Sequence, residues 1–381
     1  MCPLPEASGL TAGGRELVRP GNVAFYLPQF HPVAENDAAW GAGFSEWHNV
    51  VAARPRFKGH HQPVLPGEVG FYDLRLDQTR RAQMDLAREH GIDGFCWYHY
   101  WFDGHRILNE PFDRMLRDPA EDLPFLLCWA NEPWTRQWSG RSGEIIVEQR
   151  YSNADDERHM AFLIEVFADP RYITMDGKPV FLVYQPSQLP DAARTCDRWR
   201  AMAQRAGFRG LVLLGVESFR ARLADPATLG LDGVVEQQPD LATVRPAWRA
   251  APRRAASRLG LARRYPSMVR FPYEVLAARA LARLRASPDA RRFPTVCPGW
   301  DNSPRRDRGA VILTGASPEA YGAWLEETLR TTASPLVFVN AWNEWAEGAH
   351  LEPDRASGRA YLRAHRVAVD RAGTVSGGRP R

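Results

Sequence analysis

The chain has 381 residues, of which 44% are hydrophobic and 25% charged, an ordinary composition for a globular protein that can bury a large core. Its formal net charge of +4 gives no reason to expect nucleic acid as a partner, and no run approaches the roughly 20 apolar residues of a membrane-spanning helix. Residues 1–20 hold no apolar core of signal-peptide length, and the five cysteines form no C-x-x-C pair, so we expect a cytoplasmic protein.

Eight short apolar runs, each bounded by turn residues, recur along the chain. They are Val23–Leu27, Gly94–Tyr98, Phe125–Trp129, Val180–Tyr184, Leu211–Val216, Gly233–Gln237, Thr295–Trp300 and Leu336–Ala341. They are rich in β-branched and aromatic residues, as buried parallel strands are. Helix-like stretches fall between several of them, namely Asp77–His90, Asp155–Phe167, Asp191–Ala206 and Pro318–Leu329. Strands that alternate with helices in this way predict an α/β fold, a (β/α)8 TIM-type barrel with long βα-loop insertions.

A doubly wound parallel sheet is the alternative architecture. That fold would carry a glycine-rich turn directly after an early strand. The nearest candidate, Gly41-Ala42-Gly43, lacks the third glycine and does not follow a strand directly. The closed barrel is therefore the favoured prediction.

The predicted organisation is an N-terminal extension over residues 1–21, a catalytic barrel domain over 22–365 and a disordered tail over 366–381. Residues 245–292 are expected to form an insertion between the sixth and seventh strands, with thirteen arginines against two acidic residues. This arginine-rich insertion could anchor donor phosphates or make a peripheral contact with an anionic inner membrane. A solvated excursion is the simpler interpretation, because nearly all basic residues of the chain are arginine.

Functional side chains of a (β/α)8 barrel lie just beyond the carboxyl ends of its strands. Aromatic residues, amides and carboxylates alternate at these positions here. The candidates for substrate contact are Tyr26, Gln29, His31, Trp47, Tyr98, His99, Trp101, Trp129, Asn131, Glu132, Trp134, Gln185, Glu236, Trp300, Asn302, Trp342, Asn343 and Trp345. Aromatic faces stack on sugar rings while amides and carboxylates bind hydroxyl groups, so the mixture predicts an oligosaccharide or polysaccharide substrate. The alternative is that the aromatic residues only seal the barrel mouth.

Glu344 and Glu347 are the candidate catalytic residues. They lie three positions apart after the last strand, in the run Trp-Asn-Glu-Trp-Ala-Glu-Gly over residues 342–348, and they can face one cavity if the turn begins helically. Glycosidic cleavage needs one protonated acid and one ionised carboxylate, and like charges held close together separate their pKa values. The alternative is a solvated loop in which Glu347 caps a helix.

A metal site is the alternative that the histidines raise. His60 and His61 are adjacent, and His99 and His105 flank a loop, but the sequence has no H-x-x-x-H, H-E-x-x-H or Cys/His cluster. We therefore predict a site that needs neither metal nor cofactor.

Several longer motifs resemble one family, the WbsX-like proteins, over roughly residues 22 to 365. They are Ala24-Phe25-Tyr26-Leu27-Pro28-Gln29-Phe30-His31-Pro32, Gly70-Phe71-Tyr72-Asp73-Leu74-Arg75, Cys128-Trp129-Ala130-Asn131-Glu132-Pro133-Trp134 and Asn340-Ala341-Trp342-Asn343-Glu344-Trp345-Ala346-Glu347-Gly348. The resemblance implies a glycosyltransferase of O-antigen, lipopolysaccharide or other surface-polysaccharide clusters. WbsX-like proteins are in turn similar to glycoside hydrolase family 99, retaining endo-acting α-mannosidases and α-mannanases on a (β/α)8 barrel.

The second resemblance implies roles for the two carboxylates. Glu344 would take the proton of the sugar's own 2-hydroxyl, which attacks the anomeric carbon to give a 1,2-anhydro sugar. Glu347 would protonate the leaving oxygen and later activate water or an acceptor. Ala346 stands where the hydrolases often have histidine, so the resemblance does not extend to mannoside specificity.

Three functions remain open at this point. A glycoside hydrolase or transglycosylase fits the barrel and the paired carboxylates. A donor-dependent glycosyltransferase at the inner membrane, acting on a glycan that could be lipid-linked, fits the family resemblance, although the sequence has no D-x-D motif and no nucleotide-binding glycine loop. An inactive carbohydrate-binding barrel is disfavoured by the presence of both glutamates. The oligomeric state is left open.

Overall fold

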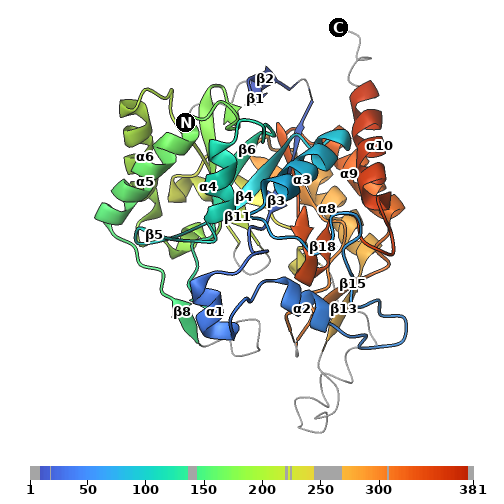
Figure 1. The fold of residues 1–381 in the computed structure, drawn as a ribbon. Coiled ribbons are helices and arrows are strands. Elements are labelled where there is room, and N and C mark those ends of the chain that lie inside the picture. Colours follow the sequence, from blue (N-terminus) through green and yellow to red (C-terminus); the bar gives the residue numbers. More distant parts are fainter. Residues whose placement is uncertain are drawn as a thin grey trace, which may run out of the picture.

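The computed structural model describes residues 9–17, 19–135, 144–218, 222–223, 225–243, 268–306 and 309–375. Its centre is a closed barrel of parallel strands (Figure 1). In chain order these are β3 (Gly21–Tyr26), β4 (Gly94–Phe102), β6 (Phe125–Trp129), β10 (Lys178–Val183), β11 (Val212–Glu217), β12 (Gly233–Glu236), β14 (Arg292–Val296) and β16 (Leu336–Val339). Each strand pairs with the next, β16 pairs with β3, and the ring closes. The predicted (β/α)8 barrel is confirmed.

Helices surround this barrel on the outside (Figure 1). They are α3 (Asp77–Glu89), α4 (Glu110–Arg117), α5 (Asn153–Phe167), α6 (Ala192–Arg205), α8 (Tyr273–Ala286), α9 (Pro318–Thr331) and α10 (Ala360–Val375). Helices α1 (Ala34–Trp40) and α2 (Trp47–Ala52) lie instead at one end of the barrel. Side chains cap several of them as the sequence suggests: Ser152 accepts from the backbone N–H of Asp155 at the start of α5. Between β11 and β12 the described chain forms only a short 3-10 turn, η3 (Pro226–Leu229).

The strands are buried on both faces. Every residue of β3, β6, β11 and β16 is buried, because one face points into the barrel and the other lies under the helices. Within the barrel, the ring of Phe25 packs on those of Tyr98 and Phe338. This packed core holds the strand ends rigidly, which is what a preorganised site at the mouth requires.

Long loops at the carboxyl ends of the strands build the mouth. The connection from β3 to α3 carries α1 and α2. Small two-stranded sheets complete the rim, formed by β7 (Trp134–Thr135) with β8 (Ile145–Val147), by β13 (Val269–Pro272) with β15 (Val311–Thr314), and by β17 (Asn343–Glu344) with β18 (Ala349–His350). β4 also pairs with the short β5 (His105–Ile107). These are the predicted long βα loops.

Both ends of the described chain are structured. The expected N-terminal extension contains β1 (Leu10–Ala12) and β2 (Arg15–Glu16), and β1 pairs with β9 (Thr174–Met175). The disordered tail was predicted wrongly for residues 366–375, because α10 continues to Val375, and residues 376–381 lie outside the described chain. Ala368 and Val369 of α10 are buried. Their apolar spacing outweighs the Gly, Ser and Arg composition of the last residues.

The expected arginine-rich insertion falls into two parts. Residues 244–267 lie outside the described chain. The rest forms β13 and α8, and α8 is the helix of the barrel unit between β12 and β14. Arginines of this part are partnered: Arg283 and Arg292 pair with Glu217 and Glu236, and Arg285 pairs with Glu327. Within the described ranges, no helix is both long and apolar enough to cross a bilayer.

Candidate active site

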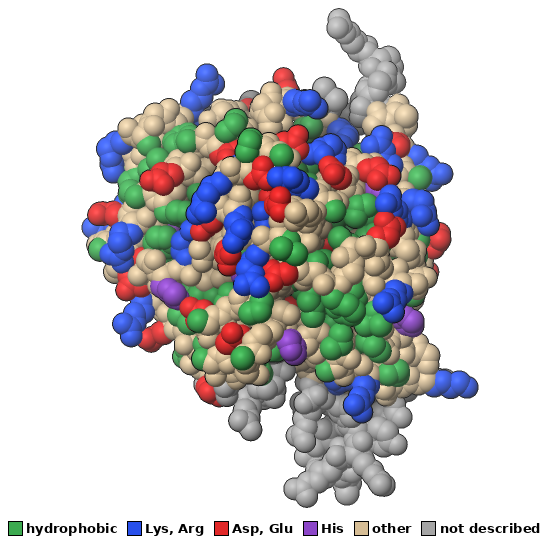
Figure 2. Space-filling model, in the orientation of Figure 1, with side chains coloured by type: hydrophobic (Ala, Val, Ile, Leu, Met, Phe, Trp, Pro, Cys, Tyr) green, Lys and Arg blue, Asp and Glu red, His purple; other side chains and the backbone are tan. Residues whose placement is uncertain are grey.

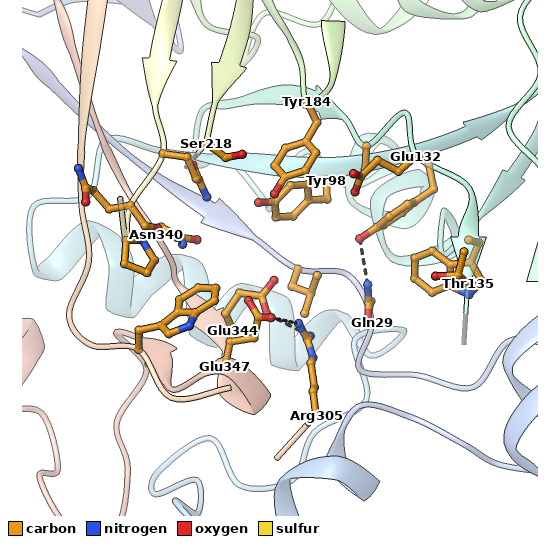
Figure 3. Close-up of a pocket in the computed structure, with 18 of the residues that line it drawn as sticks. Gln29, Tyr98, Glu132, Thr135, Tyr184, Ser218, Arg305, Asn340, Glu344 and Glu347 are labelled. Atoms are coloured by element: carbon orange, nitrogen blue, oxygen red, sulfur yellow. Dashed lines mark hydrogen bonds and ion pairs between the residues drawn. The ribbon is translucent and has the colours of Figure 1, made fainter. Parts of the chain in front are cut away.

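A cavity of about 250 Å³ opens at the carboxyl ends of the barrel strands (Figure 3). Its walls combine aromatic rings, amides and carboxylates from all eight barrel strands and the loops that follow them. The polar and aromatic lining residues are Gln29, Tyr98, Tyr100, Glu132, Trp134, Thr135, Tyr184, Ser218, Gln237, Gln238, Trp300, Arg305, Asn340, Glu344 and Glu347. Such a lining suits a ligand with both apolar faces and hydroxyl groups.

Glu344 and Glu347 reach this cavity from one tight turn. Glu344 ends β17, and Glu347 ends the 3-10 turn η6 (Trp345–Glu347). Gly348 then adopts a left-handed conformation with φ of +61°, and a Cβ there would meet the backbone nitrogen of Asp301 at 2.9 Å. Only glycine fits this exit from the turn. Figure 3 shows the two carboxylates next to each other beside Arg305.

Arg305 holds the two carboxylates together. One of its terminal nitrogens lies 3.1 Å from Glu344 Oε2 and the other 3.1 Å from Glu347 Oε1. Its Nε donates to Glu46 Oε1 at 2.7 Å. Burial works against the charged form, but these three carboxylates outweigh it and raise the pKa of Arg305. The buried guanidinium therefore remains a cation, and the cluster carries more acidic than basic groups.

The two glutamates differ in their surroundings. Burial raises the pKa of Glu344 to about 8, with Glu347 and Glu46 adding to the effect and Arg305 opposing it. The side chain of Glu344 is 8% exposed and that of Glu347 22%. A buried carboxyl group with a raised proton affinity beside a more accessible one is an arrangement suited to acid–base chemistry.

The segment that carries the pair is anchored from below. Asn343 bonds the backbone N–H and carbonyl of Leu27 at the end of β3. The indoles of Trp342 and Trp345 donate to Glu352 at 3.1 and 2.6 Å. These contacts join the last strand end to the first, so the turn has little freedom to move.

The sequence of this barrel matches a known protein family. The family is described as glycosyltransferase WbsX, and its sequence model matches residues 22–365. The chain belongs to the WbsX family. Protein WxcX from two strains of Xanthomonas campestris pv. campestris is 42% identical to this WbsX-family chain over 363 residues, 93% of the chain and 50% of WxcX. The chain thus spans about half the length of the curated relatives it matches, and the resemblance predicted from the motifs is confirmed.

Solved structures share the fold of this WbsX-family barrel. A family 99 endo-α-mannosidase from Bacteroides thetaiotaomicron superposes with a TM-score of 0.58 at 14% identity, covering 95% of this chain and 100% of that one. A glycoside hydrolase-like protein gives a TM-score of 0.57 at 14% identity, covering 92% and 94%. At such low identity the likeness establishes the barrel fold alone.

Some of the predicted substrate contacts line the cavity of the WbsX-family chain. They are Gln29, Tyr98, Glu132, Trp134 and Trp300. Gln29 Nε2 donates to the hydroxyl of Tyr100 at 2.9 Å, which fixes both groups at the rim (Figure 3). Their roles as substrate contacts remain a prediction, but their side chains are in position for it.

Three candidates on β4 and β6 lie away from the cavity. Because successive strand residues face opposite sides, Tyr98 and Tyr100 point into the cavity while His99 and Trp101 point out toward α5. His99 Nε2 lies 3.0 Å from Nε2 of His159 on α5, and Trp101 donates to Asp155. Trp129 donates to the carbonyl of Trp101. His99, Trp101 and Trp129 are therefore packing residues between barrel and helix.

Other candidates hold the loops rather than face the cavity. Asn131 bonds the backbone N–H and carbonyl of Gln185, so this pair joins the ends of β6 and β10. Glu236 pairs with Arg283 and Arg292 in a neighbouring charged cluster. Asn302 accepts from the backbone N–H of Val311. These polar groups are already bonded to other parts of the protein, and their position at the end of a strand does not predict those bonds.

The remaining candidates are buried beneath the site. Tyr26 donates to Gln83, and Trp47 donates to the carbonyl of Tyr72. His31 is buried, which lowers its pKa to about 4. Trp342, Asn343 and Trp345 also lie below the cavity and support the turn, as described above.

Arg305 and Glu46 are the main residues that sequence reasoning missed. Their hydrogen bond joins positions 259 apart in the chain, so no local spacing indicates it. Glu46 stands in an aromatic motif, Gly-Phe-Ser-Glu-Trp over residues 43–47, and this was the available signal. Across the described ranges, no three His, Cys, Asp or Glu side chains are grouped so as to bind a metal ion.

Proposed function

We propose that the chain catalyses glycosyl transfer between an α-linked glycan and water or an acceptor hydroxyl, with Glu344 and Glu347 as the reacting pair. The convergence of these two carboxylates on one cavity, joined by Arg305, is the observation that supports the proposal. The aromatic rings of Tyr98 and Tyr184 on the opposite wall (Figure 3) would stack on the sugar.

The residues can carry a two-step retaining reaction. In the reacting form the one proton of the pair lies on Glu347. Ionised Glu344 then takes the proton of the sugar 2-hydroxyl, whose oxygen attacks the anomeric carbon, while Glu347 gives its proton to the departing glycosidic oxygen. Glu347, now ionised, takes a proton from water or an acceptor hydroxyl, which attacks the same carbon. The 1,2-anhydro ring opens and the 2-oxygen recovers its proton from Glu344. The high proton affinity of buried Glu344 makes it an effective base for a weakly acidic hydroxyl.

The charges of the cavity favour a reaction on a glycan over a reaction that uses a sugar diphosphate as the donor. Among the described lining residues, Arg305 is the only Arg or Lys, and its guanidinium is bound by Glu46, Glu344 and Glu347. A diphosphate would have to compete with these three carboxylates for one cation. A donor-dependent glycosyltransferase, which the family name favours, is therefore the second candidate.

We further propose that the substrate belongs to surface-polysaccharide metabolism of the O-antigen or lipopolysaccharide type and is processed in the cytoplasm. Membership of the WbsX family supports the substrate class. Buried free Cys96, Cys128, Cys196 and Cys297 fit a reducing compartment. Arg283, Arg285 and Arg292 already pair with acidic side chains, so these three arginines give no particular support to a membrane contact or a lipid-linked substrate.

The decisive experiment is mass-spectrometric product detection with α-linked oligosaccharides, with and without a mixture of nucleotide sugars. We expect shortened or rearranged glycans without any donor, and a loss of activity of at least about 100-fold in Glu344→Gln and in Glu347→Gln. Glu68→Gln is the matched control, since Glu68 is an exposed surface residue paired with Arg359 and should leave activity unchanged.

Two results would contradict the proposal in different ways. Glycans that lengthen only when a nucleotide sugar is present would establish a donor-dependent transferase. Products formed equally by wild type and both glutamate variants would remove Glu344 and Glu347 from the mechanism.

A further inference from the structure

A second cleft, of about 360 Å³, lies on the far side of Trp300 from the catalytic cavity. Its walls come from the loop around Phe57 and His61, from β15 and the residues after it up to Ala316, and from the segment after Glu347. Trp300 lines both spaces. The proposed function above makes no use of the second cleft.

The two spaces are divided only by a thin wall. Trp300 and Asp301 form one part of it, and Glu347 and Gly348 the other. The backbone N–H of Asp301 donates to the carbonyl of Glu347 at 2.6 Å, which fixes the two parts to each other. Because Trp300 lines both spaces, the second cleft is the next hollow that a glycan leaving the first cavity on the Trp300 side would meet.

The walls of the second cleft have the chemistry of a sugar site. Phe57, Trp300 and Tyr361 supply aromatic rings. Asp301 accepts from Gln62 at 2.7 Å and lies 2.7 Å from His60 Nε2. This alternation of rings with fixed polar groups matches the catalytic cavity itself.

The carboxylates of the second cleft disfavour an anionic ligand. Burial would raise the pKa of Asp301, but hydrogen bonds from His60, Gln62 and Ser303 outweigh it and hold that pKa below its usual value. The pKa of Asp354 is also lowered, because hydrogen bonds from His350 and two backbone N–H groups outweigh the effect of burial. Two ionised carboxylates in the wall repel phosphate, so a neutral sugar fits better than a donor diphosphate.

Two ring nitrogens of this wall keep unused hydrogen-bonding capacity. Among the residues that the structure describes, neither Trp300 Nε1 nor His350 Nδ1 has a partner, and both atoms are buried. Buried polar groups are normally paired. Because both atoms are buried, they lie behind the cleft surface, and the case for a sugar site rests on the side chains that line the cleft.

We propose that the second cleft binds a further sugar unit of the same glycan that reacts at Glu344 and Glu347. The inference rests on the proposed function and deepens it, since an enzyme with sugar sites on both sides of Trp300 prefers long glycans to disaccharides. It follows that chain length, more than the identity of one terminal sugar, determines how well a substrate is used.

The test fills the cleft and measures the effect of substrate length. The variants are Ala316→Trp and Ala356→Trp, which place a bulky ring on two different walls. Each is assayed with a length series, from the disaccharide to the hexasaccharide, of the α-linked glycan that gives product with wild type. We expect kcat/KM for the longest glycans to fall at least about tenfold in the variants, while that for the disaccharide stays within about twofold.

Ala323→Trp is the matched control, because Ala323 is exposed on α9, outside both spaces. Circular dichroism identifies the variants that fold as wild type does, and either cleft variant suffices. A second readout is calorimetric titration of Glu347→Gln with the same series, with and without Ala316→Trp. We expect affinity to rise with length only where the cleft is open.

The experiments distinguish a missing second sugar site from a wrong proposed function. If wild type turns over no glycan, with or without nucleotide sugars, the proposed function falls and the second sugar site with it. If wild type is active and the folded cleft variants show the same length dependence as wild type, only the second sugar site is overturned.

Discussion

Glu352 accepts hydrogen bonds from four side chains beneath the catalytic turn. The donors are the hydroxyl of Tyr72, Nε2 of Gln83 and the indoles of Trp342 and Trp345, at 2.5 to 3.1 Å. Burial raises the pKa of Glu352 to about 7, against the effect of these donors. One carboxylate thus determines where both tryptophans of the turn lie, and through them where Glu344 lies.

Replacing this carboxylate by an amide, Glu352→Gln, should destabilise the protein by about 2–4 kcal/mol. An amide group has one acceptor oxygen, so at least one buried donor loses its partner and faces an N–H group, at about 1–3 kcal/mol for each such donor. Urea unfolding followed by tryptophan fluorescence measures the change. Glu68→Gln, at an exposed ion pair, should stay within about 0.5 kcal/mol. An unfolding free energy equal to that of wild type in Glu352→Gln would show that the four donors do not position the turn.

At the scale of elements, the strands could be predicted almost completely from the sequence and the site only in part. Strands that are buried on both faces form continuous apolar runs, which are easily recognised in a single amino-acid sequence. The same property hides which residues face the cavity, although alternation on β4 separates Tyr98 from His99. Arg305 could not be predicted at all, because its contacts with Glu46 and Glu344 exist only after the barrel closes.

Helix α10 illustrates the opposite error, in which composition concealed an element. Leu362 is fully buried, whereas Val367 on the same helix is 46% exposed. Leu362→Ala should cost about 2–5 kcal/mol of unfolding free energy, and Val367→Ala less than about 0.5 kcal/mol. Thermal or urea unfolding of the two variants measures this. Equal small changes would mean that α10 contributes little to the stability of the barrel.

At the scale of the whole molecule, acidic and basic side chains are interspersed on the face shown in Figure 2, and the unusual electrostatics lie inside. Burial raises the pKa of Glu344 from 4.5 to about 8. Between these values the folded protein binds a proton that the unfolded chain has lost, so the free energy of unfolding falls as pH rises.

This predicts a pH-dependent difference between wild type and Glu344→Gln. The amide does not titrate, so the Tm of the variant should rise relative to that of wild type as pH is raised from about 5 to about 8.5. In Glu68→Gln the difference should stay constant over this range, because Arg359 lowers the pKa of Glu68 and its titration lies at more acidic pH. Differential scanning calorimetry at several pH values measures both. A constant difference for Glu344→Gln would contradict the raised pKa.

The two ends of the described chain lie together at one end of the barrel. Strands β1 and β2 and the last turn of α10 stand opposite the mouth, where α1, α2 and β18 lie (Figure 1). A protein tethered to a sensor surface through either end would therefore present its open mouth to the solution. The proposed binding of long glycans could then be measured on a chip without hindrance from the support.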